Sequence, residues 1–444
     1  MSLPPRIPSP LLRLARAIVL SAVLLGTTAG GFWYLLTRLR PSTIRTNTKQ
    51  NPLPPPAPAP APVITRSAAS PTRASGTWSV EFLYGDAEIF PSALMSVAAG
   101  GIFPPKVHSQ RGDDRGLIAA VLESPSDDCP VTVTLGATAV FEESSVRVVL
   151  PKRGETYRIA PTLRLKHRQM FALKHPLSGE VLRVTVRIGN TVETKTSTMK
   201  VHAINDCLMN VKIGDQWFET GYLAAAYVNE NNPLLVSRVI RDATARFSGR
   251  DGFPAEIFTG YGGGAAGVRR QVEALYRTLQ EHGFHFTSMN QSSVPSPRTR
   301  SQWMRQPADT IEARQANCVD GSVLFASILL RLGLRPVLLI TPSHVFLAVH
   351  TSPQNGPADW LLAVETTMIA TQPFQVAYDT GDRELREHQA NMRHPSQAPI
   401  SLTQATGDAL LYTKQRTEFY LQIDILEARA GGIIALAENF AVRR

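Results

Sequence analysis

The sequence predicts an α+β protein in which a strand-rich region precedes a region of helices packed on antiparallel strands. Three observations support this prediction. Apolar residues alternate with period two through much of residues 77–205. After about residue 217 the apolar period lengthens to that of amphipathic helices. A long uncharged apolar run, followed by a proline-rich stretch, comes before both regions and sets them apart from the N-terminus.

The composition is that of a folded chain and does not favour a nucleic-acid-binding surface. Of the 444 residues, 43% are hydrophobic, which is ordinary for a protein with a packed core. The net charge of +10 is concentrated at the N-terminus, because residues 1–75 hold nine Lys or Arg and no Asp or Glu, leaving 10 − 9 = +1 for the rest. We therefore predict no nucleic-acid partner.

Residues 17–37 are predicted to form a transmembrane helix. These 21 residues carry no charge, and at about 1.5 Å per residue a helix of this length spans the ~30 Å bilayer core. An aromatic cluster at residues 32–34 would lie at the headgroups. A cleavable signal peptide is the alternative, because arginines precede the run and residues 28–30 are small. The apolar run continues past those small residues, which favours an anchor.

The predicted topology is that of a single-pass membrane protein. Basic residues flank the span on both sides, so the positive-inside rule gives no clear orientation. An N-terminal anchor is simplest with residues 1–16 in the cytoplasm, which gives an inner-membrane protein with its body in the periplasm or outside. Residues 38–76 form a proline-rich linker, of which residues 52–62 extend roughly 34 Å as polyproline II.

Residues 77–205 are expected to form a β-sandwich of the immunoglobulin-like kind, because short strands at this spacing are typical of that fold. Alternating segments separated by turn signals occur at residues 131–135, 146–150, 182–188 and 199–204. No motif in this region indicates catalysis, so a spacer, docking or adhesion role is the interpretation.

The three cysteines do not predict a metal site. They are far apart and no CxxC pair is present, so we predict neither a metal nor a cofactor. Cys129 and Cys207 lie near the two ends of the strand-rich region. They could form a disulfide in an oxidising compartment, or they could be two separate buried thiols.

Residues 206–369 are predicted to form a second domain, with helices at about residues 235–247 and 268–282. Between these helices Gly262, Gly264 and Gly267 match the GxGxxG pattern. No convincing buried strand precedes them, so we interpret the glycines as a loop and helix start, not as a phosphate-binding site.

The strongest functional signal is a cysteine at the start of a predicted central helix. Asn317 is suited to the N-cap, Asp320 to the first turn, Arg331 to the last turn and Gly333 to the C′ position. Apolar residues surround most of this helix, which predicts a central position in its domain. The thiol of Cys318 would lie at the positive end of the helix dipole, which favours the reactive thiolate.

Extended segments are predicted next, at residues 336–341, 344–350 and 360–365. A hairpin centred between the last two segments pairs residues whose numbers sum to 709, so His344 would face Glu365 with Cβ atoms ~5 Å apart. The competing acid, Asp359, would face His350, roughly 20 Å along the strand. This register selects Glu365 and leaves His350 a structural role.

Four motifs in this region resemble the transglutaminase-like core of the papain-type cysteine enzymes. They are Asn317-Cys318-Val319-Asp320 at the helix start, Leu332-Gly333-Leu334-Arg335-Pro336 after it, Ser343-His344-Val345-Phe346 at a strand start, and Trp360 ahead of an acid. The resemblance covers about residues 307–367. It implies a catalytic triad of Cys318, His344 and Glu365, with Glu365 where Asp is usual and Phe346 where Trp is common.

The resemblance implies a membrane-tethered cysteine enzyme that hydrolyses or transfers the acyl group of amides in protein or peptide substrates. The backbone N–H of Cys318 would be one oxyanion donor, and Gln315 and Trp303 are candidates for the second. The alternative is a non-catalytic envelope binding or scaffold protein with a degenerate domain of this type.

Residues 370–444 are predicted to be a C-terminal extension that packs on the core. Residues 374–388 are expected to form a helix or two, and residues 419–426 are apolar enough to be buried.

Overall fold

The computed structural model describes residues 78–82, 87–96, 109–113, 116–213, 216–288, 296–354, 361–392 and 420–437. The predicted N-terminal segment, membrane span and linker lie outside these ranges. Of the helices within them, none has the length and apolar character needed to cross a membrane. The described residues belong to one compact unit, Thr72–Arg444. The fold is α+β, with strands in several sheets, as the sequence predicts.

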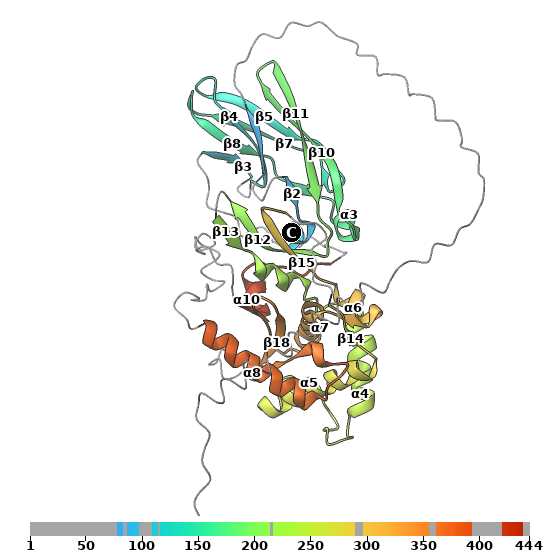
Figure 1. Ribbon diagram of the computed structural model, residues 1–444. Coiled ribbons are helices and arrows are strands. Elements are labelled where there is room, and N and C mark those ends of the chain that lie inside the picture. The colour runs from blue at the N-terminus through green and yellow to red at the C-terminus, as the bar shows by residue number, and fades with distance from the viewer. Residues whose placement is uncertain are drawn as a thin grey trace, which may run out of the picture. The chain divides into compact units, whose positions relative to one another are not determined.

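Two larger sheets and the two-stranded sheet β6-β9 make up the first part of the chain. One larger sheet has the order β1-β4-β8-β3 and the other the order β2-β11-β10-β5-β7, and β10 and β11 form a long hairpin (Figure 1). Neighbours are antiparallel except for the pairs β3–β8 and β2–β11. The elements are β1 (Ser79–Phe82), β2 (Glu88–Ile89), α2 (Pro91–Ser96), β3 (Gln110–Gly112), β4 (Ile118–Glu123), β5 (Cys129–Leu135), β6 (Phe141–Glu142), β7 (Ser144–Leu150), β8 (Thr156–Ala160), β9 (Arg164–Leu165), α3 (His167–Ala172), β10 (Leu177–Ile188) and β11 (Thr191–Val201).

The period-two pattern predicted β5, β7 and β10 because one face of each of these strands is more buried than the other. In β10, Leu182, Val184 and Val186 are buried, whereas Arg183 and Arg187 are exposed. The predicted segments at residues 131–135 and 146–150 lie within β5 and β7. The prediction for residues 199–204 was partly wrong, since β11 ends at Val201.

The two cysteines of this region are separate buried thiols. Cys129 lies in β5 and Cys207 in β12, and both are free, so the disulfide alternative is not formed. Burial raises the pKa of the Cys207 thiol far above its ordinary value. Both sulfurs therefore act as small apolar groups in the core.

The next part of the chain contains a three-stranded sheet, β13-β12-β15, and a group of helices. The predicted helix at residues 235–247 is a π-helix followed by an α-helix, and the helix predicted at residues 268–282 begins earlier, within the glycine-rich segment. The elements are β12 (Asp206–Ile213), β13 (Gln216–Glu219), the 3-10 helix η1 (Gly221–Tyr227), the π-helix η2 (Leu235–Ile240), α4 (Arg241–Phe247), α5 (Gly264–Glu281), β14 (His285–Phe286), β15 (Thr299–Trp303), α6 (Pro307–Ala313) and β16 (Gln315–Ala316).

An antiparallel sheet with the order β19-β18-β17-β20 lies between two long helices, α7 and α8 (Figure 1). Alternate strand residues pack in two separate clusters: Leu338 and Leu347 join the cluster that contains α7, whereas Leu339 and Phe346 join the cluster that contains Leu385 of α8. The elements are α7 (Cys318–Arg331), β17 (Pro336–Ile340), β18 (Val345–His350), β19 (Leu361–Val364), η4 (Thr366–Met368), α8 (Phe374–Met392), β20 (Leu421–Asp424) and α10 (Ile425–Ala430).

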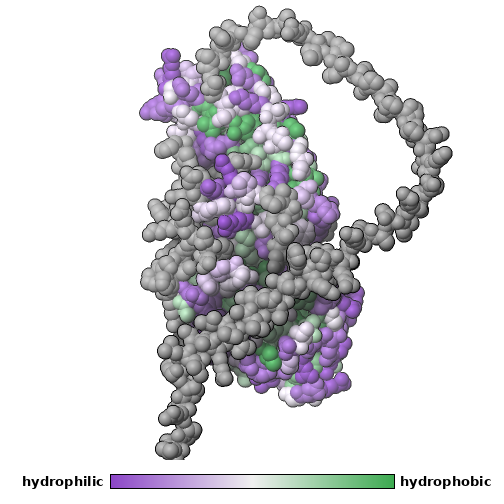
Figure 2. Space-filling view, in the orientation of Figure 1, coloured by the Kyte–Doolittle hydropathy of each residue, from purple (hydrophilic) through white to green (hydrophobic). Residues whose placement is uncertain are grey.

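The C-terminal region packs on the core, as far as it is described. Strand β20 adds to the edge of the sheet beside β17, and α8 covers a sheet face. On the side shown in Figure 2, hydrophilic side chains cover most of the described surface and hydrophobic ones are scattered. Exposed large apolar residues lie on different elements, including Val149 of β7, Phe286 of β14 and Leu426 of α10, and such scattered exposure is normal for a protein surface.

A buried histidine joins strands from the two parts of the chain. His202 follows β11, is fully buried, and contacts Glu88 of β2 at 3.0 Å and Asp206 of β12 at 3.2 Å. Phe90 stacks on its ring. Burial opposes the charge of His202, but the hydrogen bonds to Asp206 and Glu88 leave its pKa raised. Burial also opposes the charge of Glu88, yet bonds from His202 and Thr299 lower its pKa to about 2.

We expect His202→Ala to destabilise the protein by about 3–5 kcal/mol, because it removes the buried imidazole that the Glu88 and Asp206 carboxylates both contact. Because the pKa of His202 is raised in the folded state, its contribution to the free energy of unfolding is complete below the pKa of the unfolded state, near 6.5. The contribution declines as the pH rises through the pKa of the folded state. Denaturant unfolding at pH 6 and pH 9 measures both. His175→Ala, which changes an exposed histidine, is the control and should cost less than about 0.5 kcal/mol. Equal losses in the two variants would contradict the expectation.

Candidate active site

Cys318 is the first residue of α7, as the sequence predicts. Asn317 is the N-cap, and its side chain accepts a hydrogen bond from the Asp320 backbone N–H at 2.7 Å. The Asp320 carboxylate accepts in turn from the Asn317 N–H, which completes a capping box. The cap satisfies the Asp320 amide and leaves the earlier amides, including that of Cys318, without an acceptor in the helix. The thiol is partly exposed, so it is open to a reactant.

Asp320 also fixes the helix start to the segment between β15 and α6. The carboxylate accepts from the Arg305 N–H at 2.7 Å and forms an ion pair with the Arg305 guanidinium at 3.4 Å. Burial raises the pKa of Asp320, against the bonds from Arg305 and Asn317. Ser322 ties the same turn to the sheet, because its hydroxyl donates to the Val345 carbonyl at 3.3 Å. The sulfur-bearing turn is therefore held on two sides.

His344 lies in the tight turn between β17 and β18. Its N–H donates to the Thr341 hydroxyl at 3.0 Å, and its carbonyl accepts from the Thr341 N–H at 2.8 Å. The ring stacks parallel to that of Phe346 with centroids 6.1 Å apart. These contacts fix the backbone and the ring plane, and 27% of the side chain remains exposed.

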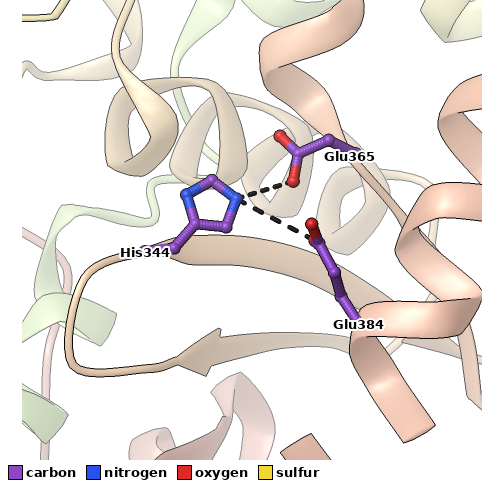
Figure 3. Close-up of side chains that lie close together, drawn as sticks. All are labelled: His344, Glu365 and Glu384. Atoms are coloured by element: carbon purple, nitrogen blue, oxygen red, sulfur yellow. Dashed lines mark hydrogen bonds and ion pairs between the residues drawn. The ribbon is translucent and has the colours of Figure 1, made fainter. Parts of the chain in front are cut away.

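Glu365 directly follows β19 and bonds to the imidazole. Its Oε2 lies 2.6 Å from His344 Nε2 (Figure 3). Its Oε1 accepts from the Thr367 N–H at 2.8 Å and from the Thr367 hydroxyl. Both carboxylate oxygens are thus engaged, and the side chain is 4% exposed.

The register predicted for this hairpin was wrong by two residues. The observed pairs, such as Leu347 with Val364, sum to 711 and not to 709, so His344 and Glu365 are not directly opposed. A shift of two keeps every side chain on its original face. Glu365 is therefore diagonal to His344 and still reaches its ring. Asp359, the competing acid, lies outside the described residues.

The imidazole lies between the acid and the thiol. Its Nε2 is taken by Glu365, and its other nitrogen points away from the carboxylates (Figure 3). Burial lowers the pKa of His344, but hydrogen bonds to the Cys318 side chain and to Glu365 outweigh it and raise the pKa to about 10. Burial raises the pKa of Glu365, but the bond to His344 leaves it lowered. This charge distribution favours an imidazolium beside the sulfur.

Glu384 is a fourth residue at this site, and the sequence did not indicate it. It comes from α8 and points at the imidazole (Figure 3), with its Oε2 4.0 Å from His344 Nε2. Burial and the neighbouring Glu365 raise the pKa of Glu384 to about 7. The only available sequence signal was its spacing: Ala377, Gly381 and Glu384 lie at i, i+4 and i+7, which is one face of a helix.

The donor atoms of His344, Glu365 and Glu384 lie within 4.8 Å of one another, close enough to consider a metal ion. Two ligands each roughly 2.0–2.2 Å from a zinc ion at a tetrahedral angle would be more than ~3 Å apart. The 2.6 Å between His344 Nε2 and Glu365 Oε2 is a hydrogen-bond distance. The arrangement fits a shared proton better than a metal.

Other candidate residues take different positions. His350 is held by Asp424, with its Nε2 3.0 Å from the carboxylate, and Arg335 bonds to the same oxygen. This is a structural cluster at the sheet edge. Trp303 ends β15, and its buried indole N–H has no partner within the described part of the chain. Gln315 lies in β16, which pairs with β14.

Comparison with protein-family models and with curated proteins found no match to this chain. The assignment of a function therefore depends on the geometry of the site.

We expect Gly321→Ala to destabilise the protein by about 1–3 kcal/mol. A Cβ at residue 321 would lie 2.9 Å from the Thr366 hydroxyl and 3.2 Å from its Cβ, so α7 and the segment that follows Glu365 would have to separate. Gly267→Ala is the matched control, because it is also a helical glycine but has nothing within 4 Å of the added atom. That variant should gain about 0.4–1 kcal/mol. Denaturant unfolding measures both, and an unchanged Gly321→Ala protein would refute the close contact.

Proposed function

We propose that Cys318, His344 and Glu365 are the catalytic triad of a cysteine enzyme that cleaves or transfers the acyl group of amides in protein or peptide substrates. One observation carries the proposal. The imidazole of His344 is bonded to a buried acid on one side and to the Cys318 thiol on the other, and that thiol begins a helix. A cysteine is activated as a thiolate when it begins a helix and contacts a histidine that is itself held by an acid.

The chemistry follows from these groups. His344 holds the Cys318 proton, and the thiolate attacks the carbonyl carbon of the substrate. The negative oxygen that develops lies near the start of α7, where the Cys318 N–H is available as a donor. Collapse breaks the C–N bond, and the imidazolium gives its proton to the leaving amine. Water or a primary amine then attacks the thioester, loses a proton to His344 and restores the thiol.

We interpret α7 on the antiparallel sheet β19-β18-β17-β20 as a transglutaminase-like core, and the two larger sheets of the first part as an immunoglobulin-like sandwich. With the predicted span at residues 17–37, the enzyme would be tethered to the inner membrane with its body in the periplasm or outside. Its substrates would be proteins or peptides of that compartment.

We expect Cys318 of the full-length protein to react with iodoacetamide well below pH 8, because the raised pKa of His344 keeps an imidazolium beside the sulfur. His344→Ala should reduce the rate at pH 7 by roughly tenfold or more, since the sulfur then loses the neighbouring imidazolium that favours its thiolate form. Mass spectrometry of peptides after timed labelling measures the rate for each cysteine.

Cys129 and Cys207 are internal controls, because both are buried and should stay unlabelled while the protein is folded. A Cys318 thiol that reacts no faster than a free cysteine at pH 7, or a rate unaffected by His344→Ala, would remove the enzyme and favour the binding or scaffold alternative. Retention of full biological activity by Cys318→Ala would support that alternative directly.

A further inference from the structure

Helix α8 is held against the acid of the proposed triad at two points. The Glu365 N–H donates to the Ala377 carbonyl at 3.1 Å. One turn later, a Cβ on Gly381 would lie 2.7 Å from backbone atoms of Ala363 and Val364, so the helix and strand backbones are as close as a glycine permits. Glu384 follows Gly381 on the same helix face. Its position over the site is therefore set by backbone contacts.

One of the two carboxylate oxygens of Glu384 lacks the donor that an ionised carboxylate needs, although 28% of the side chain is exposed. Its Oε2 is buried and has no hydrogen-bond partner in the described part of the chain. His344 Nε2 is 4.0 Å away and already donates to Glu365 at 2.6 Å. Two ionised carboxylates can only accept, so Glu365 and Glu384 could not bond to each other. A proton on Glu384 makes its carboxyl group a donor, which gives it a partner and allows it to bond to Glu365.

Burial and the charged groups around Glu384 together favour this protonated form, although two of the groups oppose it. Glu365, at the end of β19, repels a second negative charge, and burial acts in the same direction. His344, before β18, and Arg383, on α8 itself, act against it. Arg269 of α5 packs over the rings of Phe374 and Tyr378, near the start of α8. The balance leaves the pKa of Glu384 near 7.

We propose that Glu384 is a positioning residue for the triad, whose protonated carboxyl donates a hydrogen bond to Glu365 and so fixes the oxygen that holds His344. This inference rests on the proposed function. It also predicts that the arrangement changes near neutral pH, where Glu384 loses its proton and becomes a second acceptor. Glu384 does not touch the reacting sulfur, and it acts through Glu365 and His344.

The test compares full-length wild-type protein with Glu384→Gln and Glu384→Ala, in detergent micelles and with EDTA present. The alkylation rate of Cys318 by iodoacetamide is followed from pH 5 to pH 10. Wild type should show an inflection near pH 7. Glu384→Gln keeps a permanent donor, so it should match wild type within twofold at pH 6 and lack the inflection. Glu384→Ala should be about tenfold slower at pH 6, the effect of losing one such hydrogen bond.

Glu387→Gln is the matched control, because Glu387 lies on the same helix but is exposed. Its pH–rate curve should superimpose on that of wild type. A purely structural role for Glu384 would lower protein stability without changing the shape of the curve. The proposal is refuted if Glu384→Gln retains the wild-type inflection, or if Glu384→Ala reacts as fast as wild type at pH 6.

A second measurement separates this inference from the proposed enzyme activity. The folded-state pKa of Glu384 is raised above its ordinary value, so Glu384 makes wild type lose stability as the pH rises from 5 to 8, and Glu384→Gln lacks this one contribution. The thermal midpoint of Glu384→Gln relative to wild type should therefore increase over this range. If Cys318 is unreactive but the midpoint difference increases with pH, the proposed enzyme activity is refuted and the proton shared by Glu384 and Glu365 is supported. A midpoint difference independent of pH would refute the shared proton whatever the reactivity.

Discussion

The hydrogen bond between His344 and Glu365 requires the start of β18 and the end of β19 to lie side by side. The start of α7 must lie against both for the Cys318 thiol to reach the imidazole. Glycine permits this at two contacts: Gly321 brings α7 against the residue after Glu365, and Gly381 brings α8 against β19. Any larger side chain at either position would have to move backbone or a β-branched residue. The site therefore depends on how closely α7 and α8 pack against the sheet, and this packing places the polar groups in contact.

Much of the site could be predicted because its elements carry strong local signals. The helix at Cys318 has an N-cap, an acidic first turn, a basic last turn and a glycine stop, and each is found where expected. The hairpin register was harder, because both strands are apolar on both faces and no alternation fixes their pairing. The register error of two residues did not change which acid was selected, because Glu365 and His344 stay on the same face of the sheet.

Glu384 could not be predicted, for a physical reason. It stands in the charged run Asp382-Arg383-Glu384, which is typical of a solvated helix face. Only the depth at which α8 packs turns one of these residues inward, and that depth depends on contacts between residues far apart in sequence. The same limit applies to the junction at His202, where Glu88 is 114 residues away along the chain.

In the part of the chain that the structure describes, His202 and His344 each have two acids within 4.0 Å of the imidazole, and the two clusters differ in how the acids are neutralised. At His202, Glu88 also receives the Thr299 hydroxyl at 2.6 Å and lies 3.8 Å from the Lys200 ammonium, so its charge is well solvated by the protein. At His344, Glu365 takes the imidazole and both Thr367 donors, and Glu384 is left with none of them. The first cluster can therefore keep its acids ionised, whereas the second reaches the same balance by retaining a proton. The number of hydrogen-bond donors around the acids, and not the identity of the residues, decides whether both acids stay ionised or one of them exchanges a proton near neutral pH.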